Sequence, residues 1–309
     1  MPNWCANRFY ITGKPEHITR VRALLKGDTP PWPELAIQQS VSFFIAGIAG
    51  VLKPVIDVEY APFPALVSAG PGDDNVQNSA FTQWLSLLAE CAELDEETCS
   101  LIGELYTRAS LGQITWDAFP ESRKTAVRPV IAQKYHDWGG SLISACQPDA
   151  EFWARLQNNV PSRTGFDMRQ LLPTCLDVEV NGFNGGLLGG VDGGYAFYTW
   201  QRYGIKWPTG LTVDIAWESE ESLTVDFDTP WSPPDERVVA LLSERYDCQL
   251  SHYYSEAGGD YCGFREYLEG ECLSQGDSSL EYEEEETEEG WSTICGPDWI
   301  LTNVAHFGG

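Results

Sequence analysis

Three side chains in the C-terminal third of the chain are of the types that bind metal ions: Cys248, His252 and Cys262. Cys248 and His252 are four residues apart, so in an extended segment they share one face. A zinc site would need a fourth ligand and a better defined spacing, and the nine cysteines form no C-x-x-C pair. We therefore predict no metal site, and interpret these residues as buried thiols near a surface histidine.

Motifs for catalysis are equally weak. The four histidines lie in no recognisable nucleophile motif. The stretch 181–194 (NGFNGGLLGGVDGG) contains seven Gly, but it lacks the Gly-Lys-Ser/Thr ending of a phosphate loop and the dinucleotide fingerprint, and no Lys or Arg lies between 170 and 201. We interpret it as a set of turns or a hinge, and predict no catalytic residue and no cofactor.

Acidity is the strongest chemical signal. The chain carries 46 acidic and 19 basic residues, a formal charge of −27. Residues 177–309 hold 27 acids and 5 bases, a net charge of −22, against −5 for residues 1–176. Such a balance disfavours direct binding to nucleic acid or to anionic membranes. It leaves basic protein partners, cations or simple solubility.

Part of this charge lies on a predicted β-hairpin. Apolar residues alternate strictly from 211 to 217 and again from 223 to 227, which predicts two strands sharing one apolar face. Asp214, Asp226 and Asp228 then lie on the opposite face, where like charges opposed across strands are destabilising. A hairpin that keeps them indicates a role beyond solubility, so we predict an acidic partner-binding face, made by Asp214, Glu218, Glu220, Glu221, Asp226 and Asp228.

A weaker candidate surface surrounds the Gly258–Gly259 turn, where Tyr254, Asp260 and Tyr261 could contact a partner, since aromatic residues are enriched at interfaces. We expect Trp4, Trp207 and Trp231 in the core. The run 281–289 contains seven Glu and is expected to form a flexible, solvating tail.

The order of elements predicts the fold class. A strand over 3–12 and a helix from Pro15 to Gly27 open the chain. The hairpin, a helix after 231–234, a strand over 248–254 and a strand over 261–268 follow much later. Without the intervening residues this is β-α-β-β-α-β, the ferredoxin-like arrangement. We predict an α+β protein in which a split ferredoxin-like sheet domain, residues 1–27 plus 197–309, is interrupted by a large, mainly helical insert, residues 28–196.

Several segments resemble the YubB-type ferredoxin-like family, which includes Api-type phage proteins and occurs on plasmids and prophages. They are the opening Met1-Pro2-Asn3-Trp4-Cys5-Ala6-Asn7-Arg8, and residues 203–207 (YGIKW), 229–234 (TPWSPP) and 254–263 (YSEAGGDYCG). The resemblance implies the fold, its interruption by a helical insert and a mobile-element origin. It implies no reaction.

We therefore expect a phage or plasmid interaction protein that binds a basic protein surface. The finer form of this expectation is an acidic nucleic-acid mimic that inhibits a host DNA- or RNA-binding defence enzyme or complex. Direct contact with nucleic acid or membrane is not expected. The absence of a secretion signal and the scattered cysteines favour the cytoplasm. Two alternatives stay open: an enzyme with a pocket between sheet and insert, and a passive structural module. The oligomeric state is left open.

Overall fold

The computed structural model describes residues 3–139, 149–158, 165–191, 194–286 and 292–309. The chain forms two compact units. The sheet unit comprises Met1–Pro30, Arg163–Leu172 and Thr199–Gly309, and the helical unit comprises Pro31–Ser162 and Pro173–Tyr198. The insert predicted over 28–196 is thus not continuous, because 163–172 return to the sheet unit. The reason is Phe166, which is fully buried and packs edge-on against Phe9 and Phe227.

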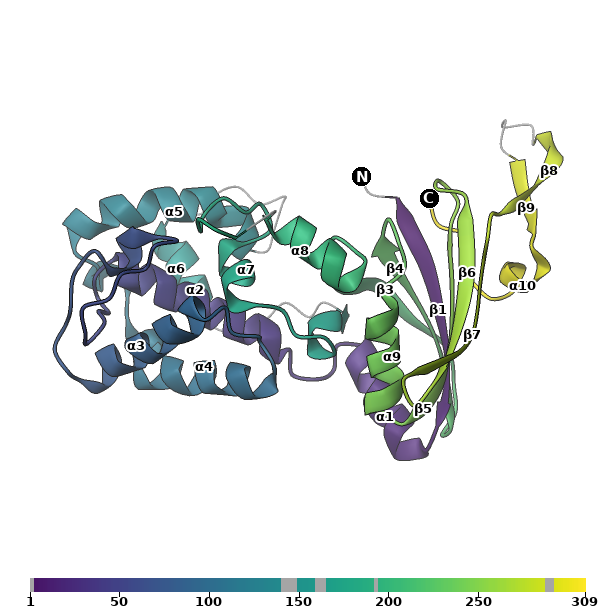
Figure 1. The fold of residues 1–309 in the computed structure, drawn as a ribbon, viewed down its shortest axis with the longest axis horizontal. Coiled ribbons are helices and arrows are strands. Elements are labelled where there is room, and N and C mark those ends of the chain that lie inside the picture. The colour runs from purple at the N-terminus through teal and green to yellow at the C-terminus, as the bar shows by residue number, and fades with distance from the viewer. Residues whose placement is uncertain (1–2, 140–148, 159–164, 192–193, 287–291) are drawn as a thin grey trace. The chain divides into compact units, whose positions relative to one another are not determined.

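A seven-stranded sheet in the order β2-β3-β4-β1-β5-β6-β7 forms the centre of the sheet unit. Its inner four strands, β3-β4-β1-β5, have the predicted ferredoxin-like order, and β1 pairs antiparallel with both β4 and β5. Helices α1 and α9 lie on one face of the sheet (Figure 1). The strands are β1 (Trp4–Gly13), β2 (Phe166–Asp167), β3 (Thr209–Glu218), β4 (Ser222–Pro230), β5 (Cys248–Glu256), β6 (Tyr261–Leu268) and β7 (Glu271–Ser278); the helices are α1 (Pro15–Leu25) and α9 (Glu236–Arg245).

The face covered by α1 and α9 is here called the helix face, and the other the open face. Apolar side chains of the strands, among them Phe9, Ile11, Val225 and Leu250, form one buried cluster on the helix face with the apolar stripes of both helices. Pro15 at the first turn of α1 and the Asp235 side chain, which caps α9 by accepting from Arg237 N, define where the helices begin.

The β3–β4 hairpin is less regular than its sequence pattern predicts. The register shifts once between Leu211 and Asp214 and again between Ile215 and Trp217. Thr212 adopts a φ of 54° at the first irregularity. The second turns Trp217 to the open face opposite Thr224, where it is 56% exposed. The prediction that Trp217 shares the apolar face with Ile215 is therefore wrong, because each extra residue in a strand reverses the alternation.

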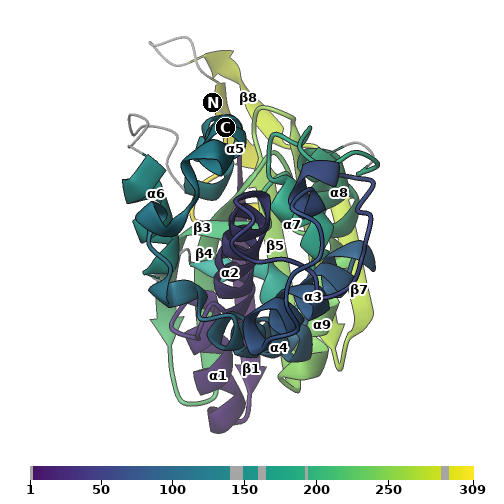
Figure 2. The same cartoon turned by 90° about the vertical axis from the view of Figure 1, so that its left-hand side faces the viewer.

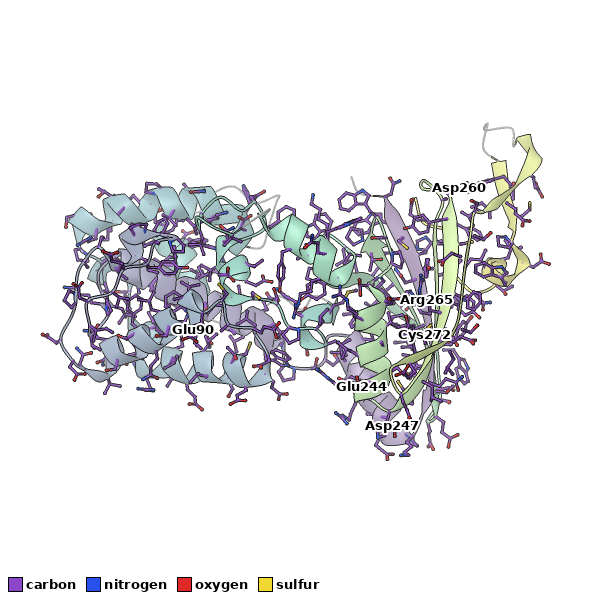
Figure 3. The ribbon with its side chains drawn as sticks, in the orientation of Figure 1. Glu90, Glu244, Asp247, Asp260, Arg265 and Cys272 are labelled. Carbon is purple, nitrogen blue, oxygen red and sulfur yellow. The ribbon has the colours of Figure 1, made fainter. Side chains whose placement is uncertain are left out.

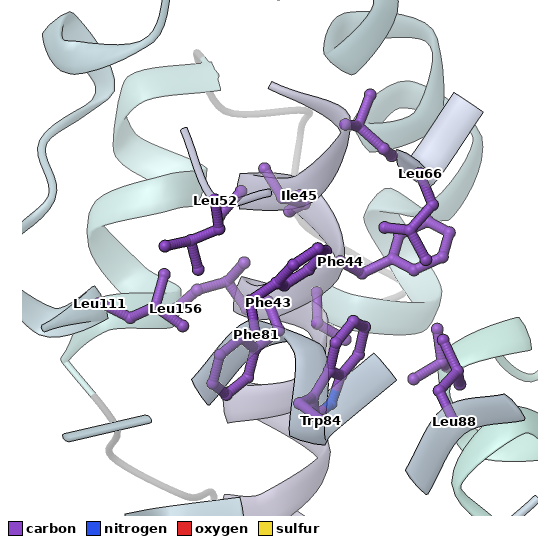
Figure 4. Packing of buried hydrophobic residues seen from close by; sticks show 14 of the residues in the cluster. Phe43, Phe44, Ile45, Leu52, Leu66, Phe81, Trp84, Leu88, Leu111 and Leu156 are labelled. Atoms are coloured by element: carbon purple, nitrogen blue, oxygen red, sulfur yellow. The ribbon is translucent and has the colours of Figure 1, made fainter. Parts of the chain in front are cut away.

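Long helices surround α2 in the helical unit (Figure 2). Aromatic side chains meet in its core: Phe43 stacks on Trp84 with ring centroids 5.1 Å apart (Figure 4). Gly47 allows this close packing, since a Cβ there would lie 2.7 Å from Phe81 and 2.8 Å from Leu66. The helices are α2 (Trp32–Ile48), α3 (Val76–Ala89), α4 (Glu96–Arg108), α5 (Glu121–Gly139), α6 (Asp149–Gln157) and α7 (Leu176–Asn181), with short 3₁₀ turns at Pro64–Val67, Leu111–Gln113 and Trp116–Ala118; Met168–Gln170 forms another in the sheet unit and α8 (Gly194–Tyr203) follows α7.

Turns form over the described part of the Gly-rich stretch, as predicted. A buried ion pair on α5 holds them: Lys134 and Asp137 lie 2.9 Å apart with side chains 0% and 1% exposed. Lys134 also donates to Gly185 O, and Asp137 accepts from Asn184 N. Because a buried charge requires partners, the Lys134–Asp137 pair bonds to the backbone of the turns, and its buried cation is not available to bind phosphate.

The C-terminal segment forms a small third cluster on the open face, containing Cys262, Leu280, Ile300 and Val304. It consists of β8 (Glu281–Glu286), β9 (Ser292–Gly296) and α10 (Asp298–Leu301). The run predicted as a flexible tail therefore includes a strand that pairs with β9; residues 287–291 lie outside the described part. None of the described helices has the length and apolar character needed to cross a membrane.

Candidate functional site

Asp214 and Asp226 lie directly opposite each other on β3 and β4, as predicted. They differ in surroundings. Asp214 is exposed, but Asp226 is a half-buried residue whose two carboxylate oxygens accept from Arg8 at 2.6 and 2.8 Å. Only 15% of the Arg8 side chain and 14% of the Asp226 side chain are exposed. The carboxylate also raises the pKa of Arg8 through this hydrogen bond. Arg8 therefore relieves the cross-strand repulsion that the sequence pattern had suggested.

Asp228 is also paired. Its carboxylate lies 2.9 Å from His306 Nε2, on the C-terminal segment that crosses the open face. The same segment receives a hydrogen bond from Tyr10 through Asn303 Oδ1 at 3.0 Å. Asp226 and Asp228 are thus not free acids of an acidic face, which corrects that part of the prediction. Arg8 was identifiable as the single base in β1, whereas nothing local in the sequence links His306 to Asp228.

The remaining predicted acids, Glu218, Glu220 and Glu221, are exposed at the hairpin turn. Glu221 O accepts from Gly13 N at 3.0 Å, and Gly13 pairs with Cys248, so this turn adjoins the α9–β5 turn. The β6–β7 turn lies there too, since a Cβ on Gly270 would be 3.2 Å from Glu244 Cβ. We call this the acidic end of the sheet unit; its exposed carboxylates are Glu218, Glu220, Glu221, Glu244, Asp247 and Glu269 (Figure 3 labels Glu244 and Asp247).

Helix α1 supplies counter-charges at the acidic end. Arg22 Nε lies 2.8 Å from Glu218, and Lys14 Nζ lies 3.2 Å from Asp247. Both pairs are exposed and therefore contribute little to stability. They leave Glu220, Glu221, Glu244 and Glu269 without an ion pair among the described residues. The acidic end is accordingly a partly neutralised anionic surface built from three turns.

The charge is more evenly distributed over the folded units than over the two stretches of sequence. The sheet unit holds 27 acids and 12 bases, a net charge of −15, because it includes the base-rich first 30 residues. The helical unit holds 19 acids and 7 bases, a net charge of −12. Seven of the sheet unit's acids belong to the run 281–289. The acidity is a property of both units, and only its arrangement at the acidic end is specific to the sheet.

The residues of the predicted aromatic turn differ in their exposure. Tyr254 and Tyr261 lie on the helix face, and only Asp260 is fully exposed. Tyr254 is 3% exposed; its hydroxyl accepts from Arg265 and donates to Asp277. Tyr261 donates to Trp231 O at 2.7 Å, and Asp260 accepts from Leu280 N. These contacts stabilise the turn from within, so Tyr254 is not a contact residue.

A buried polar network that the sequence did not suggest lies beside Tyr254. His252 Nε2 is 3.0 Å from Asn7 Oδ1, and Asn7 donates to Thr229 Oγ1 at 2.8 Å. All three residues are buried, so the prediction of a surface histidine at position 252 is wrong. Burial, together with the charge of Arg265, lowers the pKa of His252 to about 3, so the ring is neutral at neutral pH. Period-two alternation through Tyr254 could have placed His252 inward, but the cross-strand partner Asn7 is far away in sequence.

The candidate metal ligands do not converge. Cys248 and His252 lie on the helix face, whereas Cys262 pairs with Ser255 and belongs to the cluster on the open face. Among the described residues, no three His, Cys, Asp or Glu side chains are close enough to hold a metal ion.

Trp4, Trp207 and Trp231, expected in the core, are only partly buried. Lys206 Nζ lies over the rings of Trp207 and Trp231, 5.7 and 5.1 Å from their centroids.

The helical unit has an open hollow of its own, bordered by the turn after α2, the start of α3 and the turn after α4. Its polar lining includes Lys53, Asp73, Gln77 and Gln113. Asn78, also in the lining, is occupied by bonds to Lys53 N and Asp73 O. The ionisable side chains that line the hollow are one amine, Lys53, and one carboxylate, Asp73.

Two protein-family models match this chain. Residues 30–207 match the family model DUF1281, described as a protein of unknown function, and residues 212–294 match the ferredoxin-like domain in Api92-like protein. Two uncharacterised proteins of Escherichia coli (strain K12) are similar to this chain. YubB is 43% identical over 144 residues, 47% of this chain and 99% of YubB. YubA is 34% identical over 160 residues, 52% of this chain and 94% of YubA.

The crystal structure of protein api92 from Yersinia pseudotuberculosis covers 91% of this chain and 99% of its own, at 34% identity and a TM-score of 0.83. The likeness extends over both units and agrees with the split ferredoxin-like sheet described above. The chain therefore belongs to the DUF1281 family and carries the ferredoxin-like C-terminal domain of Api92-like proteins.

Proposed function

We propose that this protein is an interaction protein whose acidic end binds a basic, nucleic-acid-binding surface of a host enzyme or complex. The observation that carries the proposal is the gathering of exposed carboxylates from three separate turns at one end of the sheet, with four of them not used in ion pairs among the described residues. A Lys/Arg-rich groove is the natural complement of such a surface, and complementary potentials speed association.

The proposal shifts the contact surface away from the strand face. Asp226 and Asp228 are paired with Arg8 and His306, so they add to the electrostatic potential of the sheet but do not contact the partner directly. Of the predicted hairpin acids, Asp214, Glu220 and Glu221 are exposed and make no ion pair among the described residues, whereas the exposed Glu218 pairs with Arg22. A mimic of nucleic acid is the finer form of the proposal: the enzyme's groove would accept these carboxylates in place of phosphates. Inhibition of a defence enzyme is the outcome that this binding mode would have.

Affinity capture from host lysate, compared between two matched variants, tests the proposal. The test variant is Asp214→Asn/Glu220→Gln/Glu221→Gln, and the control removes three exposed acids of the helical unit, Glu90→Gln/Glu97→Gln/Glu104→Gln. Both lose three negative charges. We expect a captured basic protein to be lost from the first variant and retained by the second, and to elute as salt rises, because screening weakens exposed charge pairs. Equal retention by all three proteins would contradict the proposal.

A further inference from the structure

We propose that β7 is a docking edge to which an extended, basic segment of the partner adds as an eighth strand. The proposal rests on the proposed function and goes further, because it names the part of the partner that is recognised and how. In this binding mode main-chain hydrogen bonds supply affinity, and side chains that alternate along the added strand supply specificity.

The edge is open. β7 ends the sheet order and pairs with β6 on one side only among the described strands. In an antiparallel pair, alternate residues of the outer strand direct their N–H and C=O groups away from the ladder. All residues of β7 except Gly276 are exposed. The opposite edge, β2, has two residues and offers no comparable row of backbone groups.

Protection of this edge is incomplete. Natural edge strands are commonly blocked by Lys, Pro or a bulge. β7 (ECLSQGDS) contains neither Lys nor Pro, and Leu273 is 60% exposed. Its bulge lies near the first turn, where Tyr267 pairs with Cys272 and Glu266 with Ser274. From Ser274 to Ser278 the register with β6 is unbroken, so five residues present a regular edge.

The negative charge around β7 favours a basic segment as the added strand. Residues 261–283 include six acids and a single base, Arg265. Arg265 is occupied on the helix face by the Tyr254 hydroxyl and by Asp277. A second copy of this chain would bring Glu271 and Asp277 of both copies to one seam, which is unfavourable. A strand carrying Lys or Arg would place cations beside them. Glu271 adjoins the acidic end, so one basic segment can contact both surfaces.

The probe is a blocked peptide in which Lys and Val alternate, with two control peptides: one with Glu in place of Lys, and one with its alternate amides N-methylated. Binding is measured by titration calorimetry, and β7 amides by hydrogen exchange. The protein variants are Leu273→Lys, which adds a cation to the edge, and Ile56→Lys, a matched control because Ile56 is also 60% exposed but lies in the helical unit.

We expect the Lys/Val peptide to slow exchange of amides within Ser274–Ser278. We also expect roughly tenfold weaker binding by Leu273→Lys, unchanged binding by Ile56→Lys, and loss of binding by the N-methylated and Glu peptides. Undiminished binding of the N-methylated peptide or by Leu273→Lys would overturn the docking edge. So would salt-resistant dimers that Leu273→Lys abolishes, since the occupant would then be a second copy. If the edge fails while the Asp214/Glu220/Glu221 variant still loses the captured partner, the proposed function stands.

Discussion

Arg8 neutralises Asp226, one of the acids of the β3–β4 hairpin. Its guanidinium donates two bonds to Asp226, which are the short, paired kind that guanidinium and carboxylate form best, and a third to Thr302 O at 3.2 Å. Asp214 lies across from Asp226 on β3. Removal of Arg8 would leave a largely buried carboxylate facing another carboxylate without compensation.

We predict that Arg8→Met lowers the free energy of unfolding by about 3 kcal/mol, because breaking a buried pair leaves an unpaired charge. Arg8→Met/Asp226→Asn should recover most of this loss. Lys14→Met is the control; it breaks an exposed pair and should cost less than about 1 kcal/mol. Urea unfolding measures all three. A double variant no more stable than Arg8→Met would show that the pair is not what stabilises β1 against β4.

His252 gives the fold a specific pH dependence. Burial and Arg265 hold its pKa at about 3 in the folded protein, against an ordinary value of 6.5. The unfolded chain therefore binds one more proton than the folded chain between these values. The stability contributed by the neutral ring is complete above pH 6.5 and is lost as pH falls toward 3.

We predict that His252→Gln, which keeps a hydrogen-bonding side chain near Asn7, unfolds with a flatter pH dependence than the natural protein. As pH falls from 6 to 4, the unfolding constant of the natural protein should rise about tenfold more for each pH unit than that of the variant, which corresponds to one proton. Denaturant titrations at several pH values measure the difference. Parallel curves would mean that His252 is not held neutral by its surroundings.

At the scale of elements, alternation in the sequence located the β3–β4 hairpin but could not locate its bulges. A bulge reverses which residues face inward, and its position depends on the partner strand, which the local pattern does not contain. The bulges have two consequences: the large apolar side chain of Trp217 is exposed, and the β-branched Thr212 adopts a φ of 54°.

Thr212→Gly should therefore stabilise the protein by about 1 kcal/mol, because a β-branched residue at positive φ carries strain that glycine does not. Thr224→Gly, at a buried position of regular β4, should destabilise it by a similar amount. Thermal or urea unfolding distinguishes the two substitutions. Destabilisation by Thr212→Gly would indicate that the threonine side chain fixes the bulge.

The strand–helix opening and the later elements predicted the ferredoxin-like order, since each element had its own local pattern. β2 and β7 were not foreseen. Phe166–Asp167 is too short to show a pattern. Glu271–Ser278 shows no alternation of apolar and polar residues that would distinguish it from a loop. The run of Glu was interpreted as a tail because like charges resist ordering; pairing of β8 with β9 was not visible in composition.

At the scale of the whole molecule, the sequence established the acidity but misplaced it. Residues 1–30 and 163–172 together bring seven bases and three acids to the sheet unit, and three acids of residues 177–198 belong to the helical unit. The −22 of residues 177–309 therefore becomes −15 for the sheet unit. The acids of the sheet unit that make no ion pair among the described residues include four at the end where three turns meet. No local pattern predicts that meeting, because it depends on β1 lying between β4 and β5.

If the acidic end occupies a basic groove that otherwise holds nucleic acid, DNA and this protein must compete for the partner. In the competition experiment, duplex DNA is added to the complex of this protein with its captured partner, and release is followed at low and high salt. We predict that DNA displaces the protein, that displacement needs less DNA for the Asp214→Asn/Glu220→Gln/Glu221→Gln variant, and that rising salt weakens the complex. A partner that holds DNA and this protein together, with affinity independent of salt, would contradict the claim.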